Sequence, residues 1–192
     1  MFSFGVWNIR ALNMPNKKKE VWEFILSHKL ACLGLVETKV GRGNLDAIVR
    51  NILPGRCFLT NLAFSTTCRI LVLWDSPLLS VDLQFESSQL VECLVRAVNV
   101  DLSCVLSFVY GSNAVFERRD LWEDIVVHAS IDPEVPRILL GDFNAVRYPE
   151  DRCGGCLDWS ASMEECNSGI MGASLDDLWF SGLRFSWRKG NS

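Results

Sequence analysis

Four short segments of the sequence share a pattern that constrains both the fold and the place of a site. Each is an apolar, strand-like run in which every second side chain lies on the same face, and the last side chain on that face is polar. The polar endings are Asn8, Glu37, Tyr110 and the pair Asp142 and Asn144. One such ending is ordinary, because every strand returns to water. Four endings of these types predict a shared pocket at one rim of a sheet.

The segment Arg137–Asn144 carries the most chemistry. Its apolar residues predict a buried strand, and Gly141 lets the backbone turn or come close to a ligand. If the alternation continues past this glycine, Asp142 and Asn144 share one face and Phe143 points into the core. A carboxylate there can bind a metal ion or take a proton from water, and an amide can orient the attacked group. An ordinary turn containing Asp and Asn is the structural alternative.

Length and composition predict one compact, soluble domain over residues 1–192. The chain is 49% hydrophobic, and no apolar run approaches the ~18 residues of a membrane span. The start lacks the basic and apolar regions of a secretory signal, so we expect an intracellular protein with no membrane partner. The formal charge of −4 argues against nucleic-acid binding driven by total charge, although it leaves room for a local basic surface.

The order of patterns predicts an α/β fold in which helices flank a long β-rich middle. Helices are expected at residues 16–29, where Asn16 is the N-cap, and at residues 44–53, 115–129 and 161–171. The middle of the chain predicts a run of antiparallel strands between residues 56 and 110. Short strand-like pieces follow at residues 175–179 and 183–187.

The eight cysteines favour a reducing compartment. Five lie in or beside apolar runs and are expected to be small buried residues; they are Cys32, Cys57, Cys68, Cys93 and Cys104. Cys153 and Cys156, with Cys166 further on, form half of a zinc-ligand spacing, but no second pair completes it. Loop cysteines are therefore the preferred interpretation, and a structural zinc site is the alternative.

The candidate side chains suit hard-oxygen chemistry. Glu37 and Asp142, with amide oxygens beside them, are the kinds of ligand that Mg²⁺ or Mn²⁺ prefers. We expect no nucleophilic Ser or Cys beside a His, and no glycine-rich phosphate loop precedes a helix. The pattern therefore favours metal-assisted phosphodiester hydrolysis over acyl transfer or nucleoside-triphosphate chemistry, and it needs no small-molecule cofactor.

Four signatures resemble, in order and spacing, those of the endonuclease/exonuclease/phosphatase family. They are Trp7-Asn-Ile-Arg-Ala-Leu12, Leu35-Val-Glu-Thr-Lys39, Ser107-Phe-Val-Tyr-Gly111 and Gly141-Asp-Phe-Asn144. The context around them, including Arg69-Ile-Leu-Val-Leu-Trp74 and Phe185-Ser-Trp187, resembles the endonuclease domain of plant LINE-type (non-LTR) retrotransposon polyproteins. This resemblance covers nearly the whole chain.

The resemblance implies a four-layer α/β/β/α sandwich of two mixed sheets, a Mg²⁺-dependent hydrolase and DNA as the partner. Glu37 would bind the metal with support from Asn8, and Tyr110 would contact the scissile phosphate. Asp142 would position or deprotonate the attacking water. Asn144 would hold the phosphate and orient Asp142. Retroelement analogy also implies a nuclear location.

Two departures from the family pattern affect the expected activity. Ala11 replaces a glycine that is usual after the arginine, which is expected to tighten the loop beside Asn8. The family's terminal Ser-Asp-His motif has no counterpart after Phe185-Ser-Trp187. We therefore expect a sandwich without its last strands and weak or absent catalysis, because losing one oxyanion donor costs ~10²–10³ in rate. His28 and His128, both expected in helices, are poor substitutes.

Two alternatives remain open at this point. The same fold serves phosphatases and phosphodiesterases that act on smaller phosphate esters. A remnant that binds nucleic acid or protein without catalysis is the other alternative. The sequence does not determine the DNA target or the oligomeric state.

Overall fold

The computed structural model describes residues 2–52, 54–154, 158–179, 181–182 and 185. These residues form two compact units by their contacts. The first unit contains the residues up to Gly111 together with Glu134–Phe143, and the second contains Ser112–Pro133 and the residues from Asn144 onwards. Across the described residues, no helix has the length and apolar character needed to cross a membrane.

The first unit contains two mixed four-stranded sheets. The first sheet has the order β1-β2-β4-β3, in which β1 pairs with β2 in parallel and the other pairs are antiparallel. The second sheet has the order β5-β6-β7-β8, in which only β7 and β8 are parallel. The strands are β1 (Ser3–Asn8), β2 (Leu30–Gly41), β3 (Cys57–Thr60), β4 (Thr67–Trp74), β5 (Leu79–Glu86), β6 (Leu90–Ala97), β7 (Ser103–Tyr110) and β8 (Arg137–Asp142).

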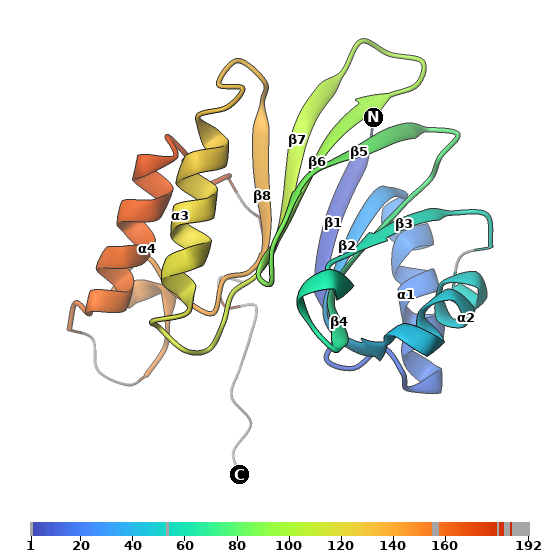
Figure 1. The fold of residues 1–192 in the computed structure, drawn as a ribbon, viewed down its shortest axis with the longest axis horizontal. Helices are drawn as coiled ribbons and strands as arrows, with labels where there is room; N and C mark the ends of the chain where they lie inside the picture. The colour runs from blue at the N-terminus through green and yellow to red at the C-terminus, as the bar shows by residue number, and fades with distance from the viewer. Residues whose placement is uncertain (1, 53, 155–157, 180, 183–184, 186–192) are drawn as a thin grey trace. The chain divides into compact units, whose positions relative to one another are not determined.

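Helices α1 (Pro15–His28) and α2 (Arg42–Ile52) cover the outer face of the first sheet (Figure 1). Their buried residues, among them Val21 and Ile48, pack with Leu33 and Leu71 of the sheet in one core. A second core joins the facing sides of the two sheets, because side chains alternate along each strand and both faces of β2 and β4 are therefore buried. The sheets approach so closely that a Cβ on Gly34 would lie 2.2 Å from the Phe108 ring.

The second unit is built on helices α3 (Arg118–Ala129) and α4 (Ala161–Gly172), which pack against each other. The Ser160 hydroxyl caps α4 by accepting a hydrogen bond from the backbone N–H of Met163, as expected for a serine at this position. At Gly169 the Cβ of another residue would lie 3.0 Å from Trp122, so the small residue allows the close packing of the two helices.

The predicted α/β class with two mixed sheets is confirmed, but several details of the prediction are wrong. Asn16 is not the N-cap of α1: the helix begins at Pro15, and Met14 occupies the cap position without a side-chain hydrogen bond. Proline suits the first helical position because its missing N–H would have no helical partner there. No strand forms at residues 175–179. Residues 183–184 and 186–187 of the last expected strand lie outside the described part of the chain.

Candidate active site

Three of the four polar strand endings meet in the first unit. On β1, Phe4 and Val6 face the core between the sheets, and Asn8 continues that face. On β7 and β8 the same face ends in Tyr110 and Asp142, which are direct neighbours in the parallel register. The Asn8 amide donates a hydrogen bond of 2.7 Å to Oδ2 of Asp142, across 134 residues of sequence. Strand alternation therefore predicted the correct face for these residues.

Glu37 also lies near this region, but its position depends on a bulge in β2 and not on the expected alternation. Alternation placed it with Leu33 and Leu35, but those residues face helices α1 and α2, away from the second sheet. A bulge in β2 changes the direction: between the paired positions Val36 and Val40, three residues of β2 lie opposite a single residue of β4, and Glu37 has a left-handed φ of 56°. The expected alternation is therefore wrong at this strand end.

The electrostatics of Tyr110 show that both carboxylates lie near it. Burial raises the pKa of its phenol, and the negative charges of Glu37 and Asp142 raise it further, while Arg69 and Arg10 oppose the rise. We call Asn8, Glu37, Tyr110 and Asp142 the strand-end cluster. Because the phenol keeps its proton at neutral pH, it can act there as a hydrogen-bond donor.

Two cations hold the Glu37 carboxylate. Lys39 Nζ lies 3.0 Å from Oε1, and Arg10 Nε lies 3.9 Å from Oε2. Arg10, Ala11 and Lys39, like Glu37, have left-handed φ angles, and backbone hydrogen bonds from Ala11 to Glu37 and from Leu12 to Thr38 join the two loops. Non-glycine residues rarely adopt this conformation, so these loops store backbone strain. Neither cation was predicted from the sequence, although both lie within the signatures.

Asn144 lies in the second unit, and the premise used to place it is wrong. Strand β8 ends at Asp142, and Asn144 has a φ of 48°, so the extended alternation reaches Asp142 but does not continue to Asn144. Gly141 lies within β8 and makes no turn, and a Cβ at this position would lie 2.0 Å from the Val109 carbonyl oxygen. The glycine therefore permits a close approach between neighbouring strands.

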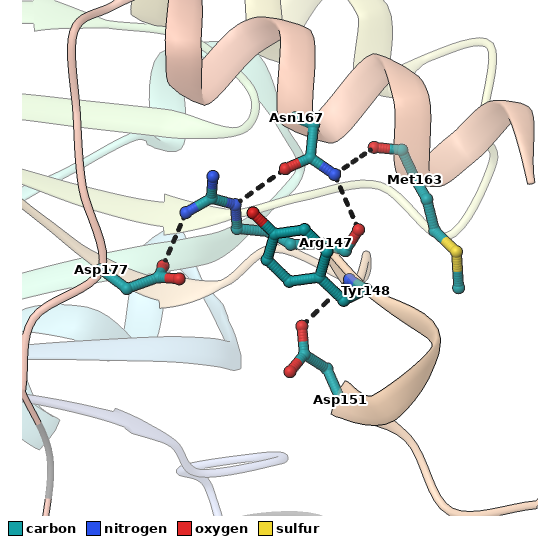
Figure 2. Close-up of polar contacts among 6 residues, drawn as sticks. All are labelled: Arg147, Tyr148, Asp151, Met163, Asn167 and Asp177. Carbon is teal, nitrogen blue, oxygen red and sulfur yellow. Dashed lines mark hydrogen bonds and ion pairs between the residues drawn. The ribbon is translucent and has the colours of Figure 1, made fainter. Parts of the chain in front are cut away.

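The segment after Asn144 is anchored to α4 by a network that the sequence did not reveal. Arg147 donates from Nε to Asn167 Oδ1 at 3.0 Å, and its other end pairs with Asp177 at 3.0 Å. The Asn167 amide donates in return to the Arg147 and Met163 carbonyl oxygens, at 2.7 and 3.1 Å (Figure 2). Asn167 is buried and its polar atoms are satisfied, so this network is a structural clamp.

The strand-end cluster contains two oxygen donors of the type that Mg²⁺ prefers. The described residues contain no group of three or more His, Cys, Asp or Glu side chains that could hold a metal. Mg²⁺, however, commonly takes only one or two carboxylates and completes its octahedron with water and phosphate oxygens. Glu37 supplies such a carboxylate, and Oδ1 of Asn8 is a buried acceptor without a hydrogen-bond partner in the described part of the chain. A cation would satisfy that oxygen.

The cysteines and histidines supply no competing site among the residues described. Cys32, Cys68, Cys93 and Cys104 are buried as expected, whereas Cys57 is exposed, contrary to the prediction. Cys153 is exposed, Cys166 is buried in α4, and Cys156 lies outside the described residues. His28 and His128 lie on helices, as expected. His28 packs on the Phe24 ring, and its Nδ1 lies 2.9 Å from the exposed hydroxyl of Ser27, so a Ser does lie beside a His, contrary to the expectation.

A carboxylate-containing ion pair in the second sheet differs from the strand-end cluster. Glu92 pairs with Arg137 and accepts a hydrogen bond of 2.9 Å from the Ser107 hydroxyl. The side chains of Glu92 and Arg137 are only 5% and 9% exposed. We call this contact the Glu92–Arg137 pair.

The model of the family described as "Endonuclease/Exonuclease/phosphatase family" matches residues 5–190. No curated protein sequence matches the chain.

Solved structures share the fold at low identity. AP endonuclease LMAP from Leishmania major is 13% identical with a TM-score of 0.66, over 90% of this chain and 66% of that chain. The endonuclease domain of TRAS1, a telomere-specific non-LTR retrotransposon, is 13% identical with a TM-score of 0.63, over 88% of this chain and 70% of that chain. The mannosyl-6-phosphatase Bt3783 of Bacteroides thetaiotaomicron VPI-5482 is 12% identical with a TM-score of 0.55, over 76% of this chain and 66% of that chain. The chain thus spans just under two thirds of the LMAP and phosphatase structures.

Proposed function

Because the chain belongs to the endonuclease/exonuclease/phosphatase family, we propose that it hydrolyses phosphodiester bonds in DNA, with water as the nucleophile and Mg²⁺, or Mn²⁺ in its place, as the metal. The observation that carries this proposal is the hydrogen bond from Asn8 to Asp142, made beside Tyr110 and Glu37. It joins residues that are 134 positions apart in the sequence in one cluster of hard-oxygen ligands and proton-transfer groups.

Each residue of the cluster has a role that its surroundings support. Glu37 and the free oxygen of Asn8 would hold the metal, which when bound neutralises charge that develops on the phosphate. The hydrogen bond from the Asn8 amide orients the Asp142 carboxylate, which would accept a proton from the attacking water. Tyr110 donates a hydrogen bond to a phosphate oxygen, since its raised pKa keeps the phenol protonated.

Asn144 is assigned by resemblance as the residue that holds the phosphate and orients Asp142. DNA as the substrate is supported by the retroelement-like sequence context and by the similarity in fold to an AP endonuclease and to a retrotransposon endonuclease domain. The retroelement-like sequence context also supports a retroelement type of nicking and a nuclear location.

Nicking of supercoiled plasmid by the purified protein tests the proposal, with Mg²⁺ or with EDTA. Nicking by the wild type is expected to be weak and to require Mg²⁺, and Asp142→Ala is expected to lower its rate by ~10²–10⁴, the usual contribution of a general base. The matched control is Asp82→Ala, which removes an exposed carboxylate of β5 that pairs with Arg96 outside the cluster. Thermal unfolding confirms that all three proteins are folded.

Other outcomes would separate the alternatives. Equal nicking by wild type and Asp142→Ala would reject catalysis at this cluster. Binding of DNA without Mg²⁺-dependent cleavage would support a non-catalytic nucleic-acid-binding protein. Faster hydrolysis of small phosphate esters than of DNA would support a phosphatase or phosphodiesterase.

A further inference from the structure

Arg69 is a cation beside the strand-end cluster to which the proposed hydrolysis assigns no role. It lies on β4 between Cys68 and Ile70, the residues that pair with Val40 and Val36. Arg69 is therefore placed opposite the bulge that carries Glu37. It is half-buried, and among the described residues its guanidinium has no ion pair and no hydrogen bond.

Asn61 fixes the backbone at this point. Its side-chain oxygen accepts hydrogen bonds from two consecutive N–H groups, those of Arg69 at 3.3 Å and Ile70 at 2.9 Å. In a regular strand, consecutive N–H groups point in opposite directions, so β4 is irregular where Arg69 leaves it. The same Asn61 is fully buried, and its amide donates to the Ser87 and Ser88 carbonyl oxygens beside the second sheet. The position of Arg69 is thus held from both sheets.

The charge of Arg69 acts on the cluster. It lowers the pKa of Tyr110 against the effect of burial and of the two carboxylates. Arg10 has the same effect, but Arg10 is paired with Glu37. A half-buried guanidinium with five donors and no acceptor from the described part of the protein is suited to an oxyanion, since it binds phosphate oxygens in a bidentate manner.

We propose that Arg69 is a substrate-binding residue whose guanidinium contacts a phosphate oxygen of the DNA backbone beside Tyr110, and that Asn61 positions it. The inference rests on the proposed function and deepens it, because it supplies a phosphate-side cation that the four signatures do not contain. The ligand class is a phosphodiester, and no proton transfer is assigned to Arg69.

The alternative role for Arg69 is a counter-charge that only balances Glu37 and Asp142. A counter-charge acts at longer range and would be replaced fully by lysine. A bidentate contact would be replaced only in part, because the ammonium group is a point charge. The two roles therefore differ in the behaviour of Arg69→Lys and in the salt dependence of binding.

Binding of a short fluorescein-labelled DNA duplex, followed by fluorescence anisotropy in EDTA, tests the inference without any cleavage. Arg69→Ala is expected to weaken binding by about tenfold or more, as expected for the loss of a charge-assisted hydrogen bond, and Arg69→Lys is expected to restore only part of the affinity. The slope of log affinity against log salt concentration should fall by about one, the value for one lost phosphate contact. The matched control is Arg96→Ala, an exposed arginine of β6 paired with Asp82.

The outcomes separate this inference from the proposed function. Unchanged affinity and salt slope in a folded Arg69→Ala protein, or in Arg69→Gln if the alanine variant does not fold, would overturn the role of Arg69 and leave nicking through Asp142 intact. Full recovery by Arg69→Lys would identify a counter-charge and also overturn it. Loss of binding in Arg69→Ala, combined with no effect of Asp142→Ala on nicking, would support Arg69 and reject the proposed catalysis. A wild type that binds no duplex would overturn the inference.

Discussion

The Glu92–Arg137 pair and the strand-end cluster lie in the same unit and use similar side chains, but their surroundings differ. Glu92 of β6 is almost fully buried, and it accepts hydrogen bonds from the Arg137 guanidinium of β8 and from the Ser107 hydroxyl of β7. In the strand-end cluster the carboxylate of Glu37 is held by exposed cations, the amide oxygen of Asn8 has no partner in the described part of the chain, and left-handed residues surround it.

This difference distinguishes a structural polar cluster from a candidate binding site. A buried charge is tolerated when the protein itself satisfies it, and it then has no capacity left for a ligand. In the strand-end cluster the Asn8 amide oxygen lacks a hydrogen-bond partner among the described residues, and the backbone is strained. Both features cost stability, and proteins retain such features where they serve to bind a ligand. Four substitutions test the comparison.

The largest effect is expected from Arg137→Ala, which leaves Glu92 buried without its cation. The free energy of unfolding should fall by about 3–5 kcal/mol, measured by urea denaturation. The double variant Glu92→Leu with Arg137→Met should recover most of this loss, because it removes both charges and keeps apolar volume. A loss of under ~1 kcal/mol in the single variant would show that the pair is not structural.

Asn8→Ala should have an intermediate effect. It removes the hydrogen bond of 2.7 Å to the Asp142 carboxylate, and a bond to a charged group contributes about 1.5–3 kcal/mol. Since this site is only partly buried, we expect a loss at the lower end of that range in urea denaturation. The control is Asn13→Ala, which removes an exposed bond of 3.1 Å to the Lys39 carbonyl oxygen and should change stability by less than ~0.5 kcal/mol. Equal losses would contradict the comparison.

Ala11→Gly should stabilise the protein by about 1 kcal/mol, since its φ of 76° is strained for alanine and relaxed for glycine. The expected tightening of this loop by Ala11 thus takes the form of backbone strain. Ala97→Gly, at the end of regular strand β6, should have the opposite sign. Thermal unfolding of both variants measures the difference, and a destabilised Ala11→Gly protein would show that the loop is not strained.

The smallest change in stability is expected from Glu37→Gln. Its main partner, Lys39, is 60% exposed, and ion pairs of exposed groups contribute about 0.2–1 kcal/mol. Titration calorimetry with Mn²⁺ should nevertheless show weaker metal binding, because one negative ligand is lost. Unaltered Mn²⁺ affinity would remove Glu37 from the metal site.

The alternation of apolar residues by itself determined much of the fold and part of the site. It identified most of the helices and strands to within a few residues, and it placed Asn8, Tyr110 and Asp142 on faces that the folded chain brings together. The reason is physical: a regular strand directs every second side chain to one face, so its last residue can be placed by counting. Counting fails wherever the backbone departs from extended geometry, as it does at Glu37 and at Asn144.

Tertiary structure alone decided the rest. The bulge at Glu37 forms because β2 has two more residues than β4 between the same pair of paired positions. The sequence of neither strand alone predicts that register shift. Arg69 appears in the sequence as a single charge at the start of an apolar strand; its place opposite that bulge depends on the buried Asn61, which bonds to both sheets. Sequence determines which face a regular residue occupies, whereas contacts between distant segments determine where an irregular one points.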